Sequence, residues 1–217
     1  MQEVIYDGLS DKSTFQRSTS EFVAYCLTDG GACFGVFAPD GSLVAYRLSY
    51  FPRDREFNLG AGRVPPSEYA YVAHMDTTAV LPSWRRHGLA NQLNAKVLKA
   101  LRGTEVRHLF ATASPFNPNS VRALLNTGLR TIDMIEKFGG KLRLLFYRPF
   151  PDEWEDLAEG GPEWHVPLSD VSALKKLMSV GAIGMKVVDR SDEHILVLRP
   201  QSTSCNTPAL EHLEAHQ

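Results

Sequence analysis

The sequence predicts an α/β domain followed by a small C-terminal αβ appendage, and three observations predict it. A strand, a basic loop with a glycine and an amphipathic helix follow one another over residues 74–101. The turn signals PDG (39–41) and GG (139–140) each separate two β-rich runs, which predicts two hairpins. Residues 163–199 give a strand, a helix and two further strands after an acidic, turn-rich stretch. This alternation indicates a sheet with helices on its faces.

Length and composition are those of a globular protein with one ordinary domain and a small extension. The chain has 217 residues, of which 43% are hydrophobic and 22% are charged, and its net charge is −2. This charge gives no argument for nucleic-acid binding, and no apolar run approaches membrane-spanning length. No secretion signal is visible, and Cys26, Cys33 and Cys205 follow no metal-ligand spacing, so they are read as reduced thiols. We therefore expect a cytoplasmic protein with no metal, no membrane partner and no nucleic-acid partner.

The N-terminal part is expected to form a strand, a helix and a hairpin. Residues 1–9 are partly apolar, which predicts a first strand. Residues 10–27 predict a helix with Phe22 on its apolar side, although its many Ser and Thr residues are weak helix formers. The first hairpin follows over residues 32–51. Residues 52–66 are polar and rich in Gly and Pro, so we expect a loop that is either functional or a mobile surface excursion.

A central strand is predicted for residues 68–80, and a regular strand places alternate side chains on one face. On one such face would lie His74, Asp76, Thr78 and Val80. Pro82 ends the strand because proline has no N–H to give to a neighbouring strand. From Gly88 to Leu101 apolar residues recur at helical spacing, which predicts an amphipathic helix.

The loop between this strand and this helix, RRHGLA at residues 85–90, is predicted to bind an anion. The first backbone N–H groups of a helix have no partner inside the helix and carry partial positive charge. Two arginines and a glycine at this place favour a phosphate or a pyrophosphate. The loop is not a Walker loop, since no GK[ST] follows, and it lacks the G-x-G-x-x-G spacing of a dinucleotide fingerprint.

One more helix and three strands are predicted for the rest of the main domain. Residues 108–114 predict a second central strand. Asn117 and Pro118 then start a helix, as its N-cap and its first helical residue. Residues 129–135 and 141–148 flank the second hairpin turn and complete the sheet.

These elements divide the chain into three expected segments. Residues 1–150 form the main domain, and residues 151–200 form the small C-terminal αβ extension with its linker. Residues 201–217 are a polar tail that we expect to be disordered.

Two motifs resemble those of a known superfamily. VLPSWRRHGLA at residues 80–90 resembles V-x-P-x-x-[RQ]-x-x-G-x-[GA], the acyl-CoA-binding signature of the GNAT superfamily of N-acetyltransferases. NPNSVRALLNTGL at residues 117–129 is similar to the superfamily's N-x-x-[AS]-x-x-x-Y-x-x-x-G-F segment, with Leu124 where Tyr is usual and Leu129 where Phe is usual. The resemblance covers roughly residues 20–150 and is to bacterial members whose substrates are mostly unassigned. It implies the GNAT fold, a mixed, mostly antiparallel sheet flanked by helices.

The resemblance also implies acetyl-CoA as a co-substrate, lying between the strand that ends at Val80 and the strand that ends at Ser114. Backbone groups near Val80 would pair with the pantetheine arm, and a backbone N–H there would steady the oxyanion that forms when an amine attacks the thioester. Asn117 would face the pantetheine or the acceptor, and Arg85 stands at the family's Arg/Gln position. The residues implied to contact the co-substrate are Thr78, Ala79, Val80, Arg85, Arg86, His87, Gly88, Leu89, Ala90, Asn91 and Asn117.

Two residues are candidates for the base that this reaction needs. Free alkylamines are mostly protonated at neutral pH, so a proton must be removed before the amine attacks. His74 stands where several GNAT enzymes hold a glutamate, and histidine has an ordinary pKa in the useful range. Asp76 would act through a water or orient the cationic amine. For both residues a purely structural role, as a hydrogen-bonded and partly buried side chain, stays open.

The favoured function is transfer of an acetyl group from acetyl-CoA to a primary amine by direct attack on the thioester. The acceptor is left open between a small amine, an antibiotic, an amino acid and a protein amine, and homodimer formation is left open too. The alternative is a non-catalytic acyl-CoA-binding module with a protein partner. Leu124 favours that alternative because leucine cannot protonate the leaving thiolate, whereas the ionisable His74 and Asp76 favour the enzyme.

Overall fold

The computed structural model describes residues 1–28, 30–53, 55, 57–152, 154 and 161–201. Its N-terminal elements are α1 (Gln2–Asp7), η1 (Lys12–Thr14), α2 (Ser20–Leu27), β1 (Phe34–Phe37) and β2 (Leu43–Tyr50). Its central elements are η2 (Pro66–Tyr71), β3 (Val72–Val80), η3 (Pro82–Trp84), α3 (Leu89–Leu101), β4 (His108–Ala113), α4 (Pro118–Leu125), β5 (Arg130–Lys137) and β6 (Lys141–Pro149). Its C-terminal elements are β7 (Trp164–Pro167), α5 (Val171–Ser179), β8 (Ala182–Arg190) and β9 (Glu193–Pro200).

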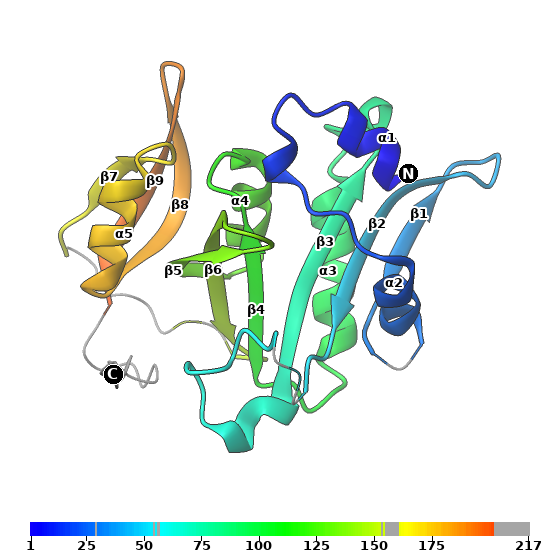
Figure 1. Cartoon of the computed structure of the whole chain (residues 1–217), viewed down its shortest axis with the longest axis horizontal. Helices are drawn as coiled ribbons and strands as arrows, with labels where there is room; N and C mark the ends of the chain where they lie inside the picture. Colours follow the sequence, from blue (N-terminus) through cyan, green and yellow to red (C-terminus); the bar gives the residue numbers. More distant parts are fainter. Residues whose placement is uncertain (29, 54, 56, 153, 155–160, 202–217) are drawn as a thin grey trace.

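The strands form one nine-stranded sheet in the order β1-β2-β3-β4-β6-β5-β8-β9-β7 (Figure 1). β3 and β4 run parallel, and the other paired neighbours in the described chain run antiparallel. The predicted mixed, mostly antiparallel sheet is thereby confirmed. Both predicted hairpins are present, as β1–β2 and β5–β6, and the predicted loop and helix appear as the basic loop and α3. The central strand predicted for residues 68–80 begins only at Val72, because residues 68–71 belong to the 3-10 helix η2.

The N-terminus differs from the sequence prediction. Residues expected to form a first strand form the helix α1, in which Ile5 is buried and its neighbour Val4 is exposed. The predicted helix of residues 10–27 is confined to α2, because Thr19 caps it: the Thr19 side chain accepts the Phe22 amide N–H at 3.2 Å. Ser and Thr side chains compete for backbone groups, which favours caps and turns over helix interior in the Ser- and Thr-rich stretch before α2.

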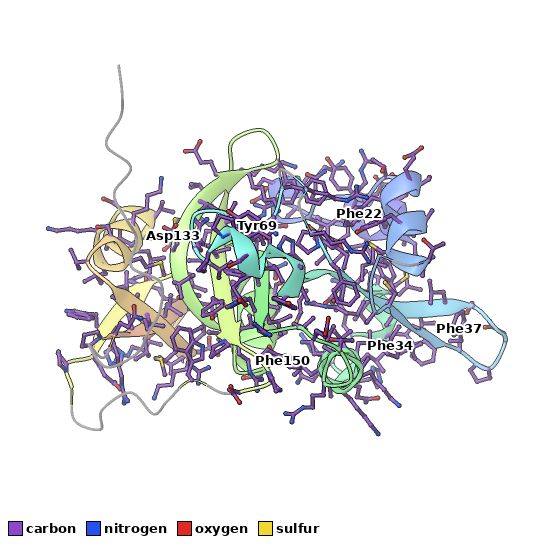
Figure 2. The ribbon with its side chains drawn as sticks, turned by 90° about the horizontal axis from the view of Figure 1, so that it is seen from below. Phe22, Phe34, Phe37, Tyr69, Asp133 and Phe150 are labelled. Carbon is purple, nitrogen blue, oxygen red and sulfur yellow. The ribbon has the colours of Figure 1, made fainter. Side chains whose placement is uncertain are left out.

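Helices cover both faces of the sheet. α3, α4 and α5 pack with the largest apolar cluster, and α2, η2 and the loop residues Leu59 and Val64 pack on the opposite face. Figure 2 shows Phe22 and Tyr69 on one side of the sheet and Phe34 and Phe150 on the other. Burial of these two apolar layers is what holds the strands and helices together.

The C-terminal unit of β7, α5, β8 and β9 continues the main sheet. β8 joins β5 where Gly184 pairs with Thr131, and the strands approach so closely that a Cβ on Gly184 would lie 2.0 Å from Thr131 Oγ1. Arg122 of α4 also donates a hydrogen bond to Asp189 of β8. Residues 155–160 of the expected linker and residues 202–217 of the expected tail lie outside the described residues, so the boundaries of the three segments stay predictions.

Candidate active site

β3 and β4 pair over only part of their length. Their parallel register runs from Val72 opposite His108 to Met75 opposite Ala111, but β3 continues to Val80. Beyond Met75 the side of β3 that faces β4 therefore lacks a strand partner within the described residues, and we call this side, from residue 76 to residue 80, the unpaired edge. Buried backbone N–H and C=O groups need hydrogen-bond partners, so the unpaired edge is suited to an extended ligand that carries amides.

A β-bulge lies at the start of the unpaired edge. Ser49 of β2 pairs with Met75, and Arg47 pairs with Thr78, so β3 uses one residue more than β2 over this stretch. The expectation of a regular strand is therefore wrong. Because of the inserted residue, the side chains of Thr78 and of the residues after it lie on the opposite face of the sheet from the one predicted.

The bulge divides the four side chains that were predicted to share a face. His74 lies opposite Tyr50, which packs with α2, whereas Met75 packs in the cluster beneath α3. Thr78 and Val80 pair with Arg47 and Ala45 of β2. Along β2 these two residues alternate with the residues that pack against α2, so they lie on the other face of the sheet. His74 is thus directed to the α2 face and Thr78 to the α3 face.

The basic loop follows the unpaired edge directly and leads into α3. Arg86 and Gly88 adopt positive φ angles of 65° and 70°. Gly88 is the N-cap of α3, and no side chain caps the helix. In the described chain the amide N–H groups of Arg86, His87 and Gly88 have no hydrogen-bond acceptor, and these three residues are exposed. Successive unpaired N–H groups beside an uncapped helix N-terminus form a concave anion site.

Asn117 follows β4, the strand that pairs with only the first part of β3. Its Oδ1 accepts the Ser120 amide N–H at 3.1 Å, so it caps α4 as predicted. The Asn117 Nδ2 has no partner among the described residues and remains available as a donor. The predicted co-substrate residues thus fall into three groups: the unpaired edge, the loop with the start of α3, and the cap of α4.

His74 is enclosed, with both ring nitrogens in hydrogen bonds. Only 1% of the residue is exposed. Its Nε2 accepts the amide N–H of Leu59 at 3.0 Å, so the ring proton is on Nδ1, which lies 2.6 Å from the hydroxyl oxygen of Tyr50. Burial lowers the pKa of His74 well below its usual value, and nearby Lys137 acts in the same direction. The imidazole is therefore neutral, and its one acceptor nitrogen is already occupied.

Asp76 occupies the bulge, deep in the protein but still with some solvent access. Thr77 Oγ1 donates a hydrogen bond to its Oδ1 at 2.8 Å. Burial raises the pKa of Asp76, and this effect is opposed by the Thr77 hydrogen bond and by the charges of Lys137 and Arg47. A carboxylate with a raised pKa binds a proton more readily than an exposed one, which is the property a base requires.

Two further residues bear on the chemistry of the site, Leu124 and Arg47. Leu124 is 3% exposed and packs in the main core cluster with Val121 and Leu125, so no acid stands at that position. Arg47 was not singled out from the sequence. It is the lone charged residue in the apolar run LVAYRLSY, which is the one signal that would have drawn attention to it, and its Nη1 donates to Thr78 Oγ1.

Comparison with known proteins identifies a family. The model of the acetyltransferase (GNAT) family matches residues 3–128. No curated protein matches the chain. No helix in the described ranges has the length and apolar character needed to cross a membrane.

Solved structures share the fold. A phosphinothricin acetyltransferase from Sinorhizobium meliloti, in complex with acetyl-CoA, aligns with a TM-score of 0.53 and 14% identity over 73% of this chain and 86% of that chain. Chaetomium thermophilum Naa20 with a bisubstrate analogue aligns with a TM-score of 0.53 and 13% identity over 70% and 84%. The aminoglycoside acetyltransferase AAC(6')-Ib with paromomycin and acetyl-CoA gives 0.51 and 14% over 71% and 92%.

A shorter match, to AAC(6')-Ib with coenzyme A and kanamycin, spans 66% of that chain with a TM-score of 0.45. The argument for the family therefore comes from the family model, which covers more than half of the sequence. The fold supports it, because the longer alignments cover most of both chains. This protein belongs to the acetyltransferase (GNAT) family.

Proposed function

We propose that the protein transfers an acetyl group from acetyl-CoA to a primary amine, by direct attack of the amine on the thioester. The observation that carries this proposal is the continuity of the unpaired edge with the loop and the N-terminus of α3. Together they offer partners for an extended chain with amides that ends in a pyrophosphate. Similar structures with acetyl-CoA bound, the phosphinothricin acetyltransferase among them, support the choice of co-substrate.

The described residues fit acetyl-CoA. Backbone groups of Thr78, Ala79 and Val80 lie on the unpaired edge and would hold the pantetheine arm. Residues 85–91 would hold the pyrophosphate through amide N–H groups and the arginine side chains, and Asn117 Nδ2 would donate from the opposite side. Acetyl-CoA supplies the acetyl group as a thioester. The N–H groups of the unpaired edge would stabilise negative charge on the carbonyl oxygen during attack.

We assign the base to Asp76 in preference to His74. His74 cannot take a proton on Nε2 without losing the hydrogen bond from Leu59. Asp76 has a raised pKa and retains solvent access, so it would accept the ammonium proton directly or through a water. The leaving thiolate needs no acid at Leu124, because the conjugate thiol has a pKa of about 8.5.

The test is turnover by the purified chain of acetyl-CoA with a library of primary amines, read as release of free CoA thiol. We expect turnover with at least one class of amine and its loss in Asp76→Asn, with acetyl-CoA binding retained. Binding of acetyl-CoA without turnover of any amine would instead identify the non-catalytic module. Failure to bind acetyl-CoA would contradict the assignment of the unpaired edge and the loop.

A further inference from the structure

Arg47 is a buried cation beside the candidate site that neither the fold nor the proposed chemistry explains. It lies on β2, directly opposite Thr78 of β3, on the face of the sheet that α3 covers. Only 3% of it is exposed. Burial lowers the pKa of Arg47 to about 10, which still leaves the guanidinium protonated at neutral pH. A buried cation requires partners for its N–H groups.

Only one of the three guanidinium nitrogens has a hydrogen-bond partner. Nη1 donates to Thr78 Oγ1, whereas Nε and Nη2 are buried and have no acceptor in the described part of the chain. These two nitrogens lie on the same side of the planar guanidinium group. On that side, the Nε–H bond is parallel to one of the two Nη2–H bonds. We call this pair the side edge of Arg47. Two parallel N–H donors match the two oxygens of a carboxylate.

Two other arginines have acceptors for their terminal guanidinium nitrogens, although Nε of Arg63 also has no partner among the described residues. Arg143 is also buried and donates to the backbone oxygens of Leu142 and Ser13, both at 2.8 Å. Arg63 pairs with Asp133 at 2.9 Å. The carboxylate whose charge acts on Arg47 is that of Asp76, but Asp76 accepts from Thr77 and has no hydrogen bond to Arg47 among the described atoms. The side edge of Arg47 therefore has no acceptor among the described residues, and the carboxylate of a bound ligand would satisfy it.

The position of Arg47 limits what that acceptor belongs to. Thr78, which holds Nη1, lies on the unpaired edge and retains solvent access. A group bound at the side edge would therefore lie next to the ligand that pairs with β3, on the face that α3 covers. In the proposed function, the acyl group of the thioester and the acceptor amine would meet along the unpaired edge.

We propose that the side edge of Arg47 binds a carboxylate carried by one of the two reactants. The carboxylate is either the free end of a dicarboxylic acyl group on CoA or the carboxylate of an amino-acid acceptor. This proposal rests on the proposed function for the identity of the reactants, and on the hydrogen bonds of Arg47 for the carboxylate.

The experiment has two arms that separate the sources. In the donor arm, succinyl-CoA is compared with acetyl-CoA against one amine. In the acceptor arm, β-alanine is compared with ethylamine, and phenylalanine with phenethylamine, using acetyl-CoA. Each comparison is made twice, as kcat/KM and as a dissociation constant from calorimetry, with the acceptors titrated into the CoA-bound protein. Calorimetry reports on the carboxylate even when no transfer occurs.

Three variants accompany the wild type. Arg47→Met removes the charge and all donors, and Arg47→Lys keeps the charge without the two parallel donors. Arg63→Met is the matched control, because Arg63 already has its own carboxylate in Asp133. We expect a carboxylate preference of about 10- to 100-fold in one arm, retained in Arg63→Met and lost in both Arg47 variants.

The outcomes are distinct. A preference in the donor arm identifies a dicarboxylic acyl donor, and a preference in the acceptor arm identifies an amino acid. The absence of any preference in the wild type overturns the proposal, whether or not the variants fold, and so does a preference that survives in Arg47→Met. If no amine is acylated, the proposed function fails, while the ratio of dissociation constants still decides the role of Arg47.

Discussion

The amide N–H of Leu59 donates a hydrogen bond to Nε2 of His74 across 3.0 Å. This contact joins residues 57–66 of the predicted loop to the central strand, and the buried side chains of Leu59 and Val64 add apolar contacts to the same face. Residues 57–66 of the loop therefore pack on the α2 face of the sheet. His74 is held in one neutral tautomer by this bond and by Tyr50.

The first prediction is that His74 makes stability depend on pH. The pKa of His74 is lower in the folded protein than in the unfolded chain, where it is 6.5. As the pH falls below 6.5, the unfolded chain therefore binds a proton that the folded protein does not bind, and the free energy of unfolding decreases. The loss should reach up to about 1.4 kcal/mol per pH unit. Urea unfolding of wild type and His74→Gln at about pH 7.5 and about pH 5.5 measures it.

Glutamine at position 74 can still accept from Leu59 but does not titrate. The pKa of His108 is also lowered by burial and acts with the same sign, so only the difference between the two proteins is informative. An equal dependence on pH in both would contradict the role given to His74.

The second prediction is that Asp76→Asn loses activity and gains stability. Removal of the base should lower kcat/KM by roughly 10²- to 10⁴-fold with little change in the dissociation constant of acetyl-CoA. The folded pKa of Asp76 is raised, so its ionised form is disfavoured by folding at neutral pH, and the variant should melt at a higher temperature. This gain should shrink as the pH falls toward the unfolded pKa of 3.8.

The matched control for Asp76→Asn is Asp133→Asn, since Asp133 is paired with Arg63. That variant should melt at a lower temperature and keep its activity. Full activity in Asp76→Asn would remove this carboxylate from the mechanism.

The third prediction concerns Gly88 and the affinity for acetyl-CoA. Because Gly88 has a φ of 70°, Gly88→Ala should cost about 1–2 kcal/mol of stability and misplace the N–H groups of the loop. Gly88→Glu should abolish the rise in melting temperature caused by acetyl-CoA, since it adds a negative charge at the anion site.

Gly103→Ala is the control for Gly88, at the opposite end of α3. Its new Cβ would meet only the Ala100 carbonyl oxygen, at an ordinary 3.6 Å. A normal acetyl-CoA shift in Gly88→Glu would show that the loop is not the pyrophosphate site.

The fourth prediction is that a phenol at position 124 gives no faster turnover. Leu124 packs in the core cluster, so Leu124→Phe and Leu124→Tyr should each cost about 1–3 kcal/mol through overpacking. The pair differs only in a hydroxyl group, so a comparison of their kcat values isolates the hydroxyl. A clearly higher kcat for the tyrosine variant would show that this position reaches the leaving sulfur.

Much of the fold could be predicted from the sequence because its signals are local. Three of these signals act within a few residues, and each agrees with one element of the structure. β3 ends before Pro82, α3 has the helical spacing from Leu89 to Leu101, and α4 begins after the Asn117 cap. α1 was missed because an apolar run of three residues is too short to separate a strand from one helical turn.

The site was only partly predictable because its decisive features depend on register between strands. The bulge exists because β2 and β3 pair with unequal numbers of residues, which no pattern within β3 reveals. The Leu59 bond to His74 joins residues that are 15 positions apart, and Arg47 meets Thr78 across 31 positions. Side-chain partners of this kind follow from the assembled sheet.

The close pairing of Gly184 with Thr131 has a consequence for assembly. By placing β8 against β5, it closes that edge of the main sheet, so a strand from a second copy or from a peptide cannot be added there. In the described sheet the outermost strands are β1 and β7. Any sheet extended across two subunits would therefore be joined through one of these two strands.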